Sequence, residues 1–300
     1  MNYNLKIVSA YKGMTEYIPA VRSAKSLAES PLESPAKSPD LAKLWAEYVI
    51  EPYWNEWAAG QFNEERIRSE MSEPITDMDR LEEAVNVLSS SNMEETLLRA
   101  YEKISQMLPP PEADKVVCVY ANTRIDEGVH GIVGTCTGDS ILIQVNPLVP
   151  GWEAYVQWVL AHEHNHTVWG YNYYYLKHNG SQDLLTAIIT EGEADSFAKA
   201  ICPGVHPRWI RALSAVQERE QWAAMKEYLF CEDNMELHRR FFFGCEKTAT
   251  PANTGYTIGF NIVQAYLKAM PGVSFPELAG KDAKEIFEFS DYDNDGCPKV

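Results

Sequence analysis

The sequence has no long hydrophobic segment. Nowhere in its 300 residues does an uninterrupted apolar run approach the length of about 18 that a membrane-spanning helix needs. Residues 1–10 offer one lysine and a single apolar pair, Ile7-Val8, which is too short for the core of a secretory signal. Both absences predict a cytoplasmic protein that does not use a membrane as a partner.

Positive charge is also scarce. The chain has 26 Lys and Arg residues against 43 Asp and Glu residues, which gives a formal net charge of −17. Such a charge repels phosphate backbones and anionic lipid headgroups, so we expect neither nucleic acids nor membrane surfaces as partners. Hydrophobic residues at 45% and charged residues at 23% are close to globular averages and predict a folded chain.

Cysteines are few and widely separated, and no two form a C-x-x-C pair. A chain of this length can build its own core, so it does not need a disulfide framework. We expect free, buried thiols without a chemical role at Cys118, Cys136, Cys202, Cys231, Cys245 and Cys297.

Proline divides the amino-terminal part of the chain. Repeated Ser-Pro steps in residues 26–40 disfavour helix and predict a loop. In residues 41–108 apolar side chains recur every three or four positions, which predicts helices that end at the three prolines of residues 109–111. We therefore expect a mainly helical lead-in over residues 1–114 and a second domain over residues 115–300.

The hydrophobic period shortens after the prolines. Residues 116–120 and 141–145 are compact runs rich in β-branched side chains, and they predict two strands of a small sheet. From Trp152 onward the helical spacing returns, with breaks at glycines and prolines. Strands followed by helices predict an α+β fold in which a small sheet packs on a mainly helical body.

One predicted helix carries a metal-binding pattern. Residues 159–168 contain the motif H-E-x-x-H, which runs from His162 to His166. On a helix these two histidines lie one turn apart on the same face, so both can reach one Zn²⁺, with Glu163 beside them. His164 points away from that face, and we expect it to pack or to hydrogen-bond rather than to bind metal.

A catalytic zinc needs a third protein ligand and one position open for water. Glu191 lies 25 positions after His166, in a predicted helix that also carries Asp195 one turn later. We expect Glu191 to bind the metal and Asp195 to accept the outer N–H of a ligating histidine, which fixes its tautomer. Glu193 lies about 200° around that helix from Glu191 and is expected to point away from the metal. The alternative is an ordinary acidic helix face.

These residues resemble the zincin metallopeptidases, and among them the gluzincin branch, in which H-E-x-x-H is followed by a glutamate ligand and an aspartate four residues later. More specifically, the chain looks like a bacterial family of predicted zinc-dependent proteases long filed as a domain of unknown function. The resemblance covers roughly residues 115–290 and leaves residues 1–40 outside. It rests also on Val145-Asn146-Pro147, Glu191-Gly192-Glu193-Ala194-Asp195 and Gly255-Tyr256-x-x-Gly259.

The resemblance implies a zincin-like catalytic domain, Zn²⁺ as the cofactor and a peptide or protein as the substrate. It assigns metal binding to His162, His166 and Glu191, and general-base catalysis to Glu163. A donor to the developing oxyanion is also needed, and Tyr256 is the candidate unless it only packs. The alternatives for that donor are His206, His178 and His238.

The resemblance also suggests where a peptide binds. In zincins the strand just before the metal helix forms a sheet edge, along which an extended substrate lies by main-chain hydrogen bonds. Here that strand covers residues 141–145, and Ile141, Ile143 and Val145 are the expected substrate-binding residues. The alternative is that this strand lies inside the sheet.

Two other functions could use the same site. One is a zinc-containing binding or regulatory protein without peptidase activity, and the other is a metal hydrolase of a non-peptide amide. Glu163 favours an enzyme over a binding protein, because a zinc site that only binds has no need of a general base.

A second motif lies near the carboxyl terminus. Residues 291–296 match the opening of an EF-hand loop, but the glutamate that would complete the loop is missing. Asp291, Asp293 and Asp295 therefore form either a weak Ca²⁺ site completed from elsewhere or a solvated acidic tail.

Overall fold

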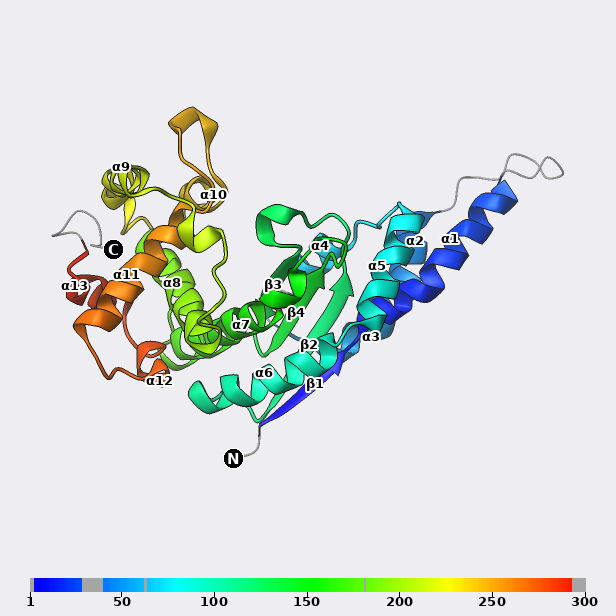
Figure 1. The fold of residues 1–300 in the computed structure, drawn as a ribbon, viewed down its shortest axis with the longest axis horizontal. Coiled ribbons are helices and arrows are strands. Elements are labelled where there is room, and N and C mark those ends of the chain that lie inside the picture. Colours follow the sequence, from blue (N-terminus) through cyan, green and yellow to red (C-terminus); the bar gives the residue numbers. More distant parts are fainter. Residues whose placement is uncertain (1–2, 29–39, 62–63, 181, 293–300) are drawn as a thin grey trace. The chain divides into compact units, whose positions relative to one another are not determined.

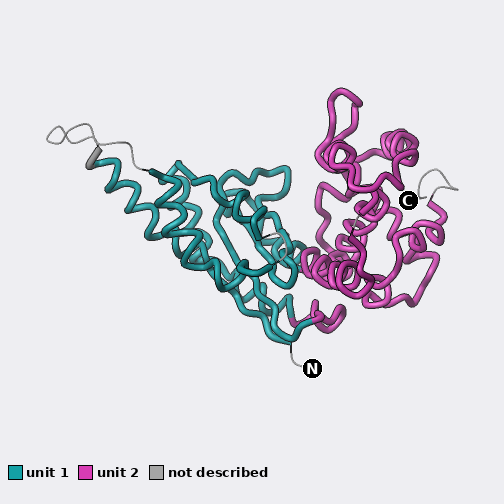
Figure 2. Tube along the Cα trace, turned by 180° about the vertical axis from the view of Figure 1, so that it is seen from behind, with its two compact units in different colours: residues 1–101, 112–160 teal, residues 102–111, 161–300 magenta. Residues whose placement is uncertain are grey.

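The structure is a computed structural model that describes residues 3–28, 40–61, 64–180 and 182–292. Contacts divide the chain into two compact units (Figure 2). Unit 1 comprises residues 1–101 and 112–160, and unit 2 comprises residues 102–111 and 161–300. Over the described ranges, none of the helices has both the length and the hydropathy needed to cross a bilayer.

Unit 1 combines a sheet with helices from the amino-terminal part of the chain (Figure 1). The predicted helical series is present, and local signals start its helices: Asp77, for example, accepts the backbone N–H of Arg80 at the start of α5. Its elements are β1 (Asn4–Val8), η1 (Ala10–Gly13), α1 (Met14–Ala28), α2 (Leu41–Trp45), η2 (Ala46–Ile50), α3 (Glu51–Trp57), α4 (Glu64–Met71), α5 (Met78–Ser90), the first part of α6 (Met93–Met107), β2 (Asp114–Ala121), η3 (Glu127–Val129), β3 (Ile132–Thr137), β4 (Ser140–Val145), η4 (Trp152–Tyr155) and the first turn of α7 (Val156–Gly170).

The sheet has the strand order β1-β2-β4-β3. Strands β1, β2 and β4 are parallel, with Val8 opposite Cys118 and Val117 opposite Ile141, and β3 pairs with β4 in the antiparallel direction. The predicted strands at residues 116–120 and 141–145 are confirmed as β2 and β4. With helices elsewhere in the chain, this mixed sheet confirms the α+β class.

The expected position of β4 in the sheet is wrong. Strand β4 is internal, and its main chain pairs with β2 on one side and β3 on the other. Ile141, Ile143 and Val145 are fully buried core residues, so they do not line an exposed edge. The physical reason is β3, which leads into β4 through a tight turn at Gly138 and covers the edge that residues 141–145 would otherwise offer.

The compact units do not follow the predicted boundary between residues 114 and 115. Because β2 pairs with β1, strands β2, β3 and β4 belong to the same unit as the amino-terminal helices. The division into a helical lead-in and a catalytic domain stays a prediction. The loop expected over residues 26–40 begins later, since α1 continues to Ala28. Asp40 caps α2, and residues 29–39 lie outside the described part of the chain.

The cysteines of the described residues are free, as expected. Cys118 and Cys202 are buried. The expectation of burial is wrong for the partly exposed Cys136, Cys231 and Cys245, and Cys297 lies outside the described residues.

Unit 2 is helical in its described residues, and its core gathers side chains from α8, α9, α10, α11 and α13. Asp183 starts α8 by accepting the N–H of Thr186 at 2.7 Å. Its elements are the end of α6, the main part of α7, η5 (Tyr171–Leu176), α8 (Leu184–Ile201), η6 (Trp209–Arg211), α9 (Ala215–Met225), η7 (Lys226–Tyr228), α10 (Met235–Phe243), η8 (Glu246–Thr248), α11 (Thr254–Ala269), α12 (Phe275–Leu278) and α13 (Ala283–Phe289).

Helices α8 and α11 lie side by side with their backbones in contact (Figure 1). Two glycines permit this approach. A Cβ atom on Gly192 would lie 2.2 Å from the carbonyl oxygen of Gly259, and one on Gly259 would lie 1.9 Å from the carbonyl oxygen of Ile188. Any larger residue at either position would force the helices apart. The crossing matters for function because Glu191 adjoins Gly192, and Tyr256 lies one turn before Gly259.

The first prediction concerns this crossing. Gly259→Ala is expected to lower the free energy of unfolding by about 3 kcal/mol, since its methyl group has no room between the two backbones. Urea unfolding of the purified variant measures the effect. Gly204→Ala is the matched control, because nothing lies within 4 Å of a Cβ at Gly204. Equal stability of the two variants would contradict the close packing of α8 on α11.

Candidate metal centre

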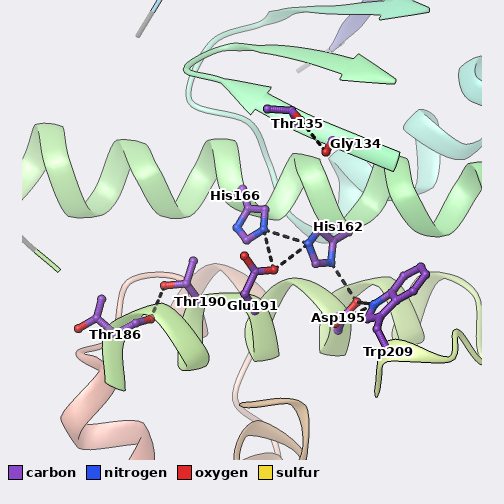
Figure 3. Close-up of polar contacts among 9 residues, drawn as sticks. All are labelled: Gly134, Thr135, His162, His166, Thr186, Thr190, Glu191, Asp195 and Trp209. Atoms are coloured by element: carbon purple, nitrogen blue, oxygen red, sulfur yellow. Dashed lines mark hydrogen bonds and ion pairs between the residues drawn. The ribbon is translucent and has the colours of Figure 1, made fainter. Parts of the chain in front are cut away.

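Three potential metal-ligand atoms from α7 and α8 meet in unit 2 (Figure 3). His162 Nε2 lies 3.0 Å from His166 Nε2 and 3.2 Å from Glu191 Oε2. His166 Nε2 lies 3.4 Å from the same carboxylate oxygen. The structure thus brings together the three residues that the spacing predicts as metal ligands.

The helices place these side chains through ordinary helix periodicity. His162 and His166 are one turn apart on α7, and their rings are 4.6 Å apart between centroids. Helix α8 is buried around most of its circumference, so Glu191 is held among packed side chains and only 21% of its side chain is exposed. The ligand atoms are therefore fixed before any cation binds.

Asp195 supports the first of the histidines. Its Oδ1 atom lies 3.0 Å from His162 Nδ1, and the side chain of Asp195 is fully buried. A carboxylate at that distance accepts the N–H of Nδ1, which leaves the lone pair of Nε2 directed at His166 and Glu191. This is the contact that the spacing of Glu191 and Asp195 predicts.

The residues fit a bound Zn²⁺ on two grounds. The three distances of 3.0, 3.2 and 3.4 Å are close to the value of about 3.3 Å between ligand atoms that share one tetrahedral zinc with bonds of about 2.0–2.1 Å. In addition, Glu191 Oε2 is buried, and the two imidazole nitrogens that face it do not meet hydrogen-bond geometry. Two imidazole nitrogens and a carboxylate oxygen that converge in this way are stabilised by a shared cation.

The charges at the site reinforce one another. Burial by itself raises the pKa of Glu191, but His166 and His162 outweigh burial and hold that pKa far below its ordinary value. Burial alone would lower the pKa of His162, but Asp195 and Glu191 outweigh it and raise that pKa well above the usual range. Because a ligating imidazole must be neutral, a metal ion bound here would displace a proton, and zinc affinity is expected to fall as the pH falls.

Two further predicted site residues come from α7 and α11. Glu163 follows His162 on α7 and is only 7% exposed. Tyr256 comes from α11, and the charge of Glu191, burial, and the charges of Asp195 and Glu163 together raise the pKa of its phenol well above the usual range. The phenol therefore keeps its proton at neutral pH and is available as a hydrogen-bond donor.

Glu193 and His164 stand apart from the metal group, as expected. Glu193 is 1% exposed, and burial raises the pKa of its carboxyl group well above the usual range despite the opposing charge of Lys177. This shift disfavours the charged form that a metal ligand needs. His164 is fully buried, and its Nε2 lies 2.8 Å from the carbonyl oxygen of Leu108, so this histidine ties α7 to the end of α6.

The three histidines considered as alternative donors to the oxyanion lie in different surroundings. His206 is exposed and lies 3.2 Å from a guanidinium nitrogen of Arg211. His178 is exposed on the turn that follows η5. His238 stacks on Phe242 with 4.3 Å between the ring centroids, and Phe242 in turn packs edge-on against Tyr256. Tyr256 itself is influenced by the site, because the charges of Glu191, Asp195 and Glu163 raise the pKa of its phenol.

The calcium motif is only partly visible. Asp291 is described, with a φ of 53°, whereas Asp293 and Asp295 lie outside the described residues. A Ca²⁺ site there stays a prediction.

A comparison with known protein families decides the family. Residues 93–288 match the family described as Predicted Zn-dependent protease (DUF2268). The chain belongs to this family. No curated protein and no solved structure matches the chain. Membership confirms the resemblance stated from the motifs, while the finer likeness to gluzincins stays a prediction.

One contact in this member of the family was not predicted from the sequence. Trp209 of η6 donates its indole N–H to Asp195, at 3.0 Å from Oδ1 and 3.2 Å from Oδ2 (Figure 3). It follows Asp195 by 14 positions, after a break at Pro203-Gly204, so no helical spacing connects the two. No pattern in the sequence therefore predicts that Trp209 contacts Asp195.

Proposed function

We propose that the protein is a zinc-dependent peptidase whose metal is bound by His162, His166 and Glu191. The observation that carries this proposal is the convergence of His162 Nε2, His166 Nε2 and Glu191 Oε2 within one small triangle, with Asp195 behind His162. Membership of a family of predicted Zn-dependent proteases supports the same metal and reaction.

The bound zinc would polarise the scissile carbonyl group and make a water molecule more acidic. In the proposed mechanism Glu163 is the general base, because it adjoins His162 on α7 and its side chain is largely shielded from solvent. Its carboxylate accepts a proton from the attacking water and then delivers a proton to the leaving amine. Asp195 meanwhile holds His162 by its Nδ1 proton, so that this imidazole does not rotate during the reaction.

Tyr256 is the proposed donor to the oxyanion. Its phenol retains its proton because Glu191, burial, Asp195 and Glu163 all raise its pKa. A neutral donor held by packing stabilises a developing negative charge without having to reorganise. The contact of Gly192 with Gly259 supports this role, because it brings the helix of Tyr256 against the helix of Glu191.

The proposed substrate is a peptide or a protein segment. The net charge of −17 favours basic or neutral peptides over acidic ones by long-range attraction. Backbone pairing with Ile141, Ile143 and Val145 is not part of this proposal, because β4 is internal.

A mixed peptide library tests the proposal. We expect zinc-loaded protein to cleave a subset of peptides, and we expect a chelator to abolish cleavage and added zinc to restore it. Mass spectrometry of the products identifies the cleaved bonds. Protein that binds one zinc but cleaves no peptide would refute the peptidase and favour a zinc-containing binding protein or an enzyme that acts on another amide.

A further inference from the structure

Trp209 belongs to a continuous chain of hydrogen bonds that ends at the metal group. Its indole N–H lies 3.0 Å from Asp195 Oδ1 and 3.2 Å from Oδ2. The same Oδ1 atom lies 3.0 Å from His162 Nδ1. At the far side of the ring, His162 Nε2 faces Glu191 at 3.2 Å (Figure 3).

The burial of Asp195 makes this donor important. The carboxylate has no exposed surface, so protein groups must provide the hydrogen bonds that water would otherwise give. The indole N–H lies within hydrogen-bond distance of both carboxylate oxygens and provides part of this solvation. The orientation of Asp195 in turn sets the direction in which His162 presents Nε2.

Trp209 is itself held in place from α11. Its backbone carbonyl oxygen accepts the hydroxyl proton of Thr257 at 2.8 Å, and the same hydroxyl oxygen accepts the N–H of Ala212 at 3.1 Å. Thr257 is 2% exposed and directly follows Tyr256 on the helix. Both ends of the η6 turn are thereby fastened to α11, so the indole reaches Asp195 from an anchored backbone.

We propose that Trp209 is a positioning residue for the zinc site: its N–H orients Asp195, and through Asp195 it orients His162 for metal binding. The inference rests on the proposed function in that it requires a metal at His162, His166 and Glu191. It does not require that the metal be used for peptide hydrolysis.

The test measures zinc affinity rather than activity. Trp209→Phe keeps an aromatic ring and removes the N–H, and replacement of Trp209 by benzothienylalanine removes the N–H with almost no change of shape. In metal-free protein titrated with Zn²⁺ against a chelating indicator, we expect each change to weaken zinc affinity by about tenfold, the lower end of the effect of groups that support metal ligands. Trp222→Phe is the matched control, because Trp222 packs in the core of unit 2. The zinc affinity of this variant should equal that of the unmodified protein.

A double-variant cycle separates positioning from packing. Asp195→Ala is expected to weaken zinc affinity by about 10- to 100-fold. If Trp209 acts through Asp195, then Trp209→Phe has no further effect on zinc affinity in the Asp195→Ala background. The temperature of unfolding of the metal-free Trp209→Phe variant shows whether a general loss of structure contributes.

Two results would overturn the inference. One is an unchanged zinc affinity in the benzothienylalanine protein, and the other is the same loss from Trp209→Phe with and without Asp195. Failure of the proposed function has a different signature: zinc binds with the expected dependence on Trp209, but no peptide is cleaved. If His162→Ala leaves zinc affinity unchanged, the metal site itself is wrong and the inference falls with it.

Discussion

Replacement of Glu163 by glutamine is expected to lower peptide hydrolysis by at least ~10²-fold while one zinc remains bound, because general-base catalysis typically contributes 10²–10⁴-fold. Glutamine has nearly the same shape as glutamate, but its amide cannot take a proton from water at neutral pH. Zinc is retained because Glu163 is not a member of the group formed by His162, His166 and Glu191. The measurement pairs initial rates on a cleaved library peptide with metal analysis of the same protein sample.

Two controls make the result specific. Glu236→Gln removes an exposed carboxylate from α10 and should leave the rate unchanged. Glu193→Gln replaces a buried carboxyl group on α8 whose pKa burial raises, and it lies outside the metal group, so it should also keep the rate within a few fold. Full activity in Glu163→Gln would rule out Glu163 as the general base, and an equal loss in Glu193→Gln would show that the loss reflects a disturbed interior.

The parts of the fold and site that could be predicted from the sequence depend on short-range periodicity. The positions of His162 and His166 on one helix face follow from a spacing of four residues. The same holds for Glu191 and Asp195, and the hydrogen bond from His162 to Asp195 then requires only that the two helices face each other. Strand β2 was predictable because residues 116–120 form an apolar run that the core buries.

The strands that could not be predicted lack such a run. Strand β1 buries only Val8 of its five residues, and β3 contains Gly134 and short polar side chains that are partly exposed. Main-chain pairing holds β1 against β2 and β3 against β4. Such pairing does not depend on side chains, so it produces no hydrophobic pattern in the sequence. Without β3, residues 141–145 look like an edge strand.

Contacts between distant segments are the other part that spacing cannot predict. Gly192 and Gly259 have meaning only as a pair, because each makes room for the backbone of the opposite helix. Trp209 reaches Asp195 because Thr257 fastens η6 to α11, which is a contact between residues 48 positions apart in the chain. The metal group and Asp195 were therefore predictable, but Trp209 and the contact between the two glycines were not.

Removal of the two histidines is expected to abolish zinc binding. His162→Ala with His166→Ala leaves Glu191 as the remaining member of the metal group, and one carboxylate cannot hold a structural or catalytic zinc at micromolar metal concentration. Metal analysis after dialysis should give about one zinc per chain for the unmodified protein and close to none for the double variant. Zinc should also raise the free energy of unfolding of the unmodified protein by about 4 kcal/mol when free zinc is 1,000 times its dissociation constant. The double variant should not be stabilised in this way.

The matched control removes two other histidines of unit 2. His178 and His206 are both exposed and outside the metal group, so His178→Ala with His206→Ala should keep the zinc content and the stabilisation by zinc. The comparison is informative because surface histidines can bind zinc weakly without a built site. If the His162 and His166 variant kept its zinc while the control lost it, the metal would lie elsewhere. His162, His166 and Glu191 would then form a buried cluster held together by a shared proton and not by a metal ion.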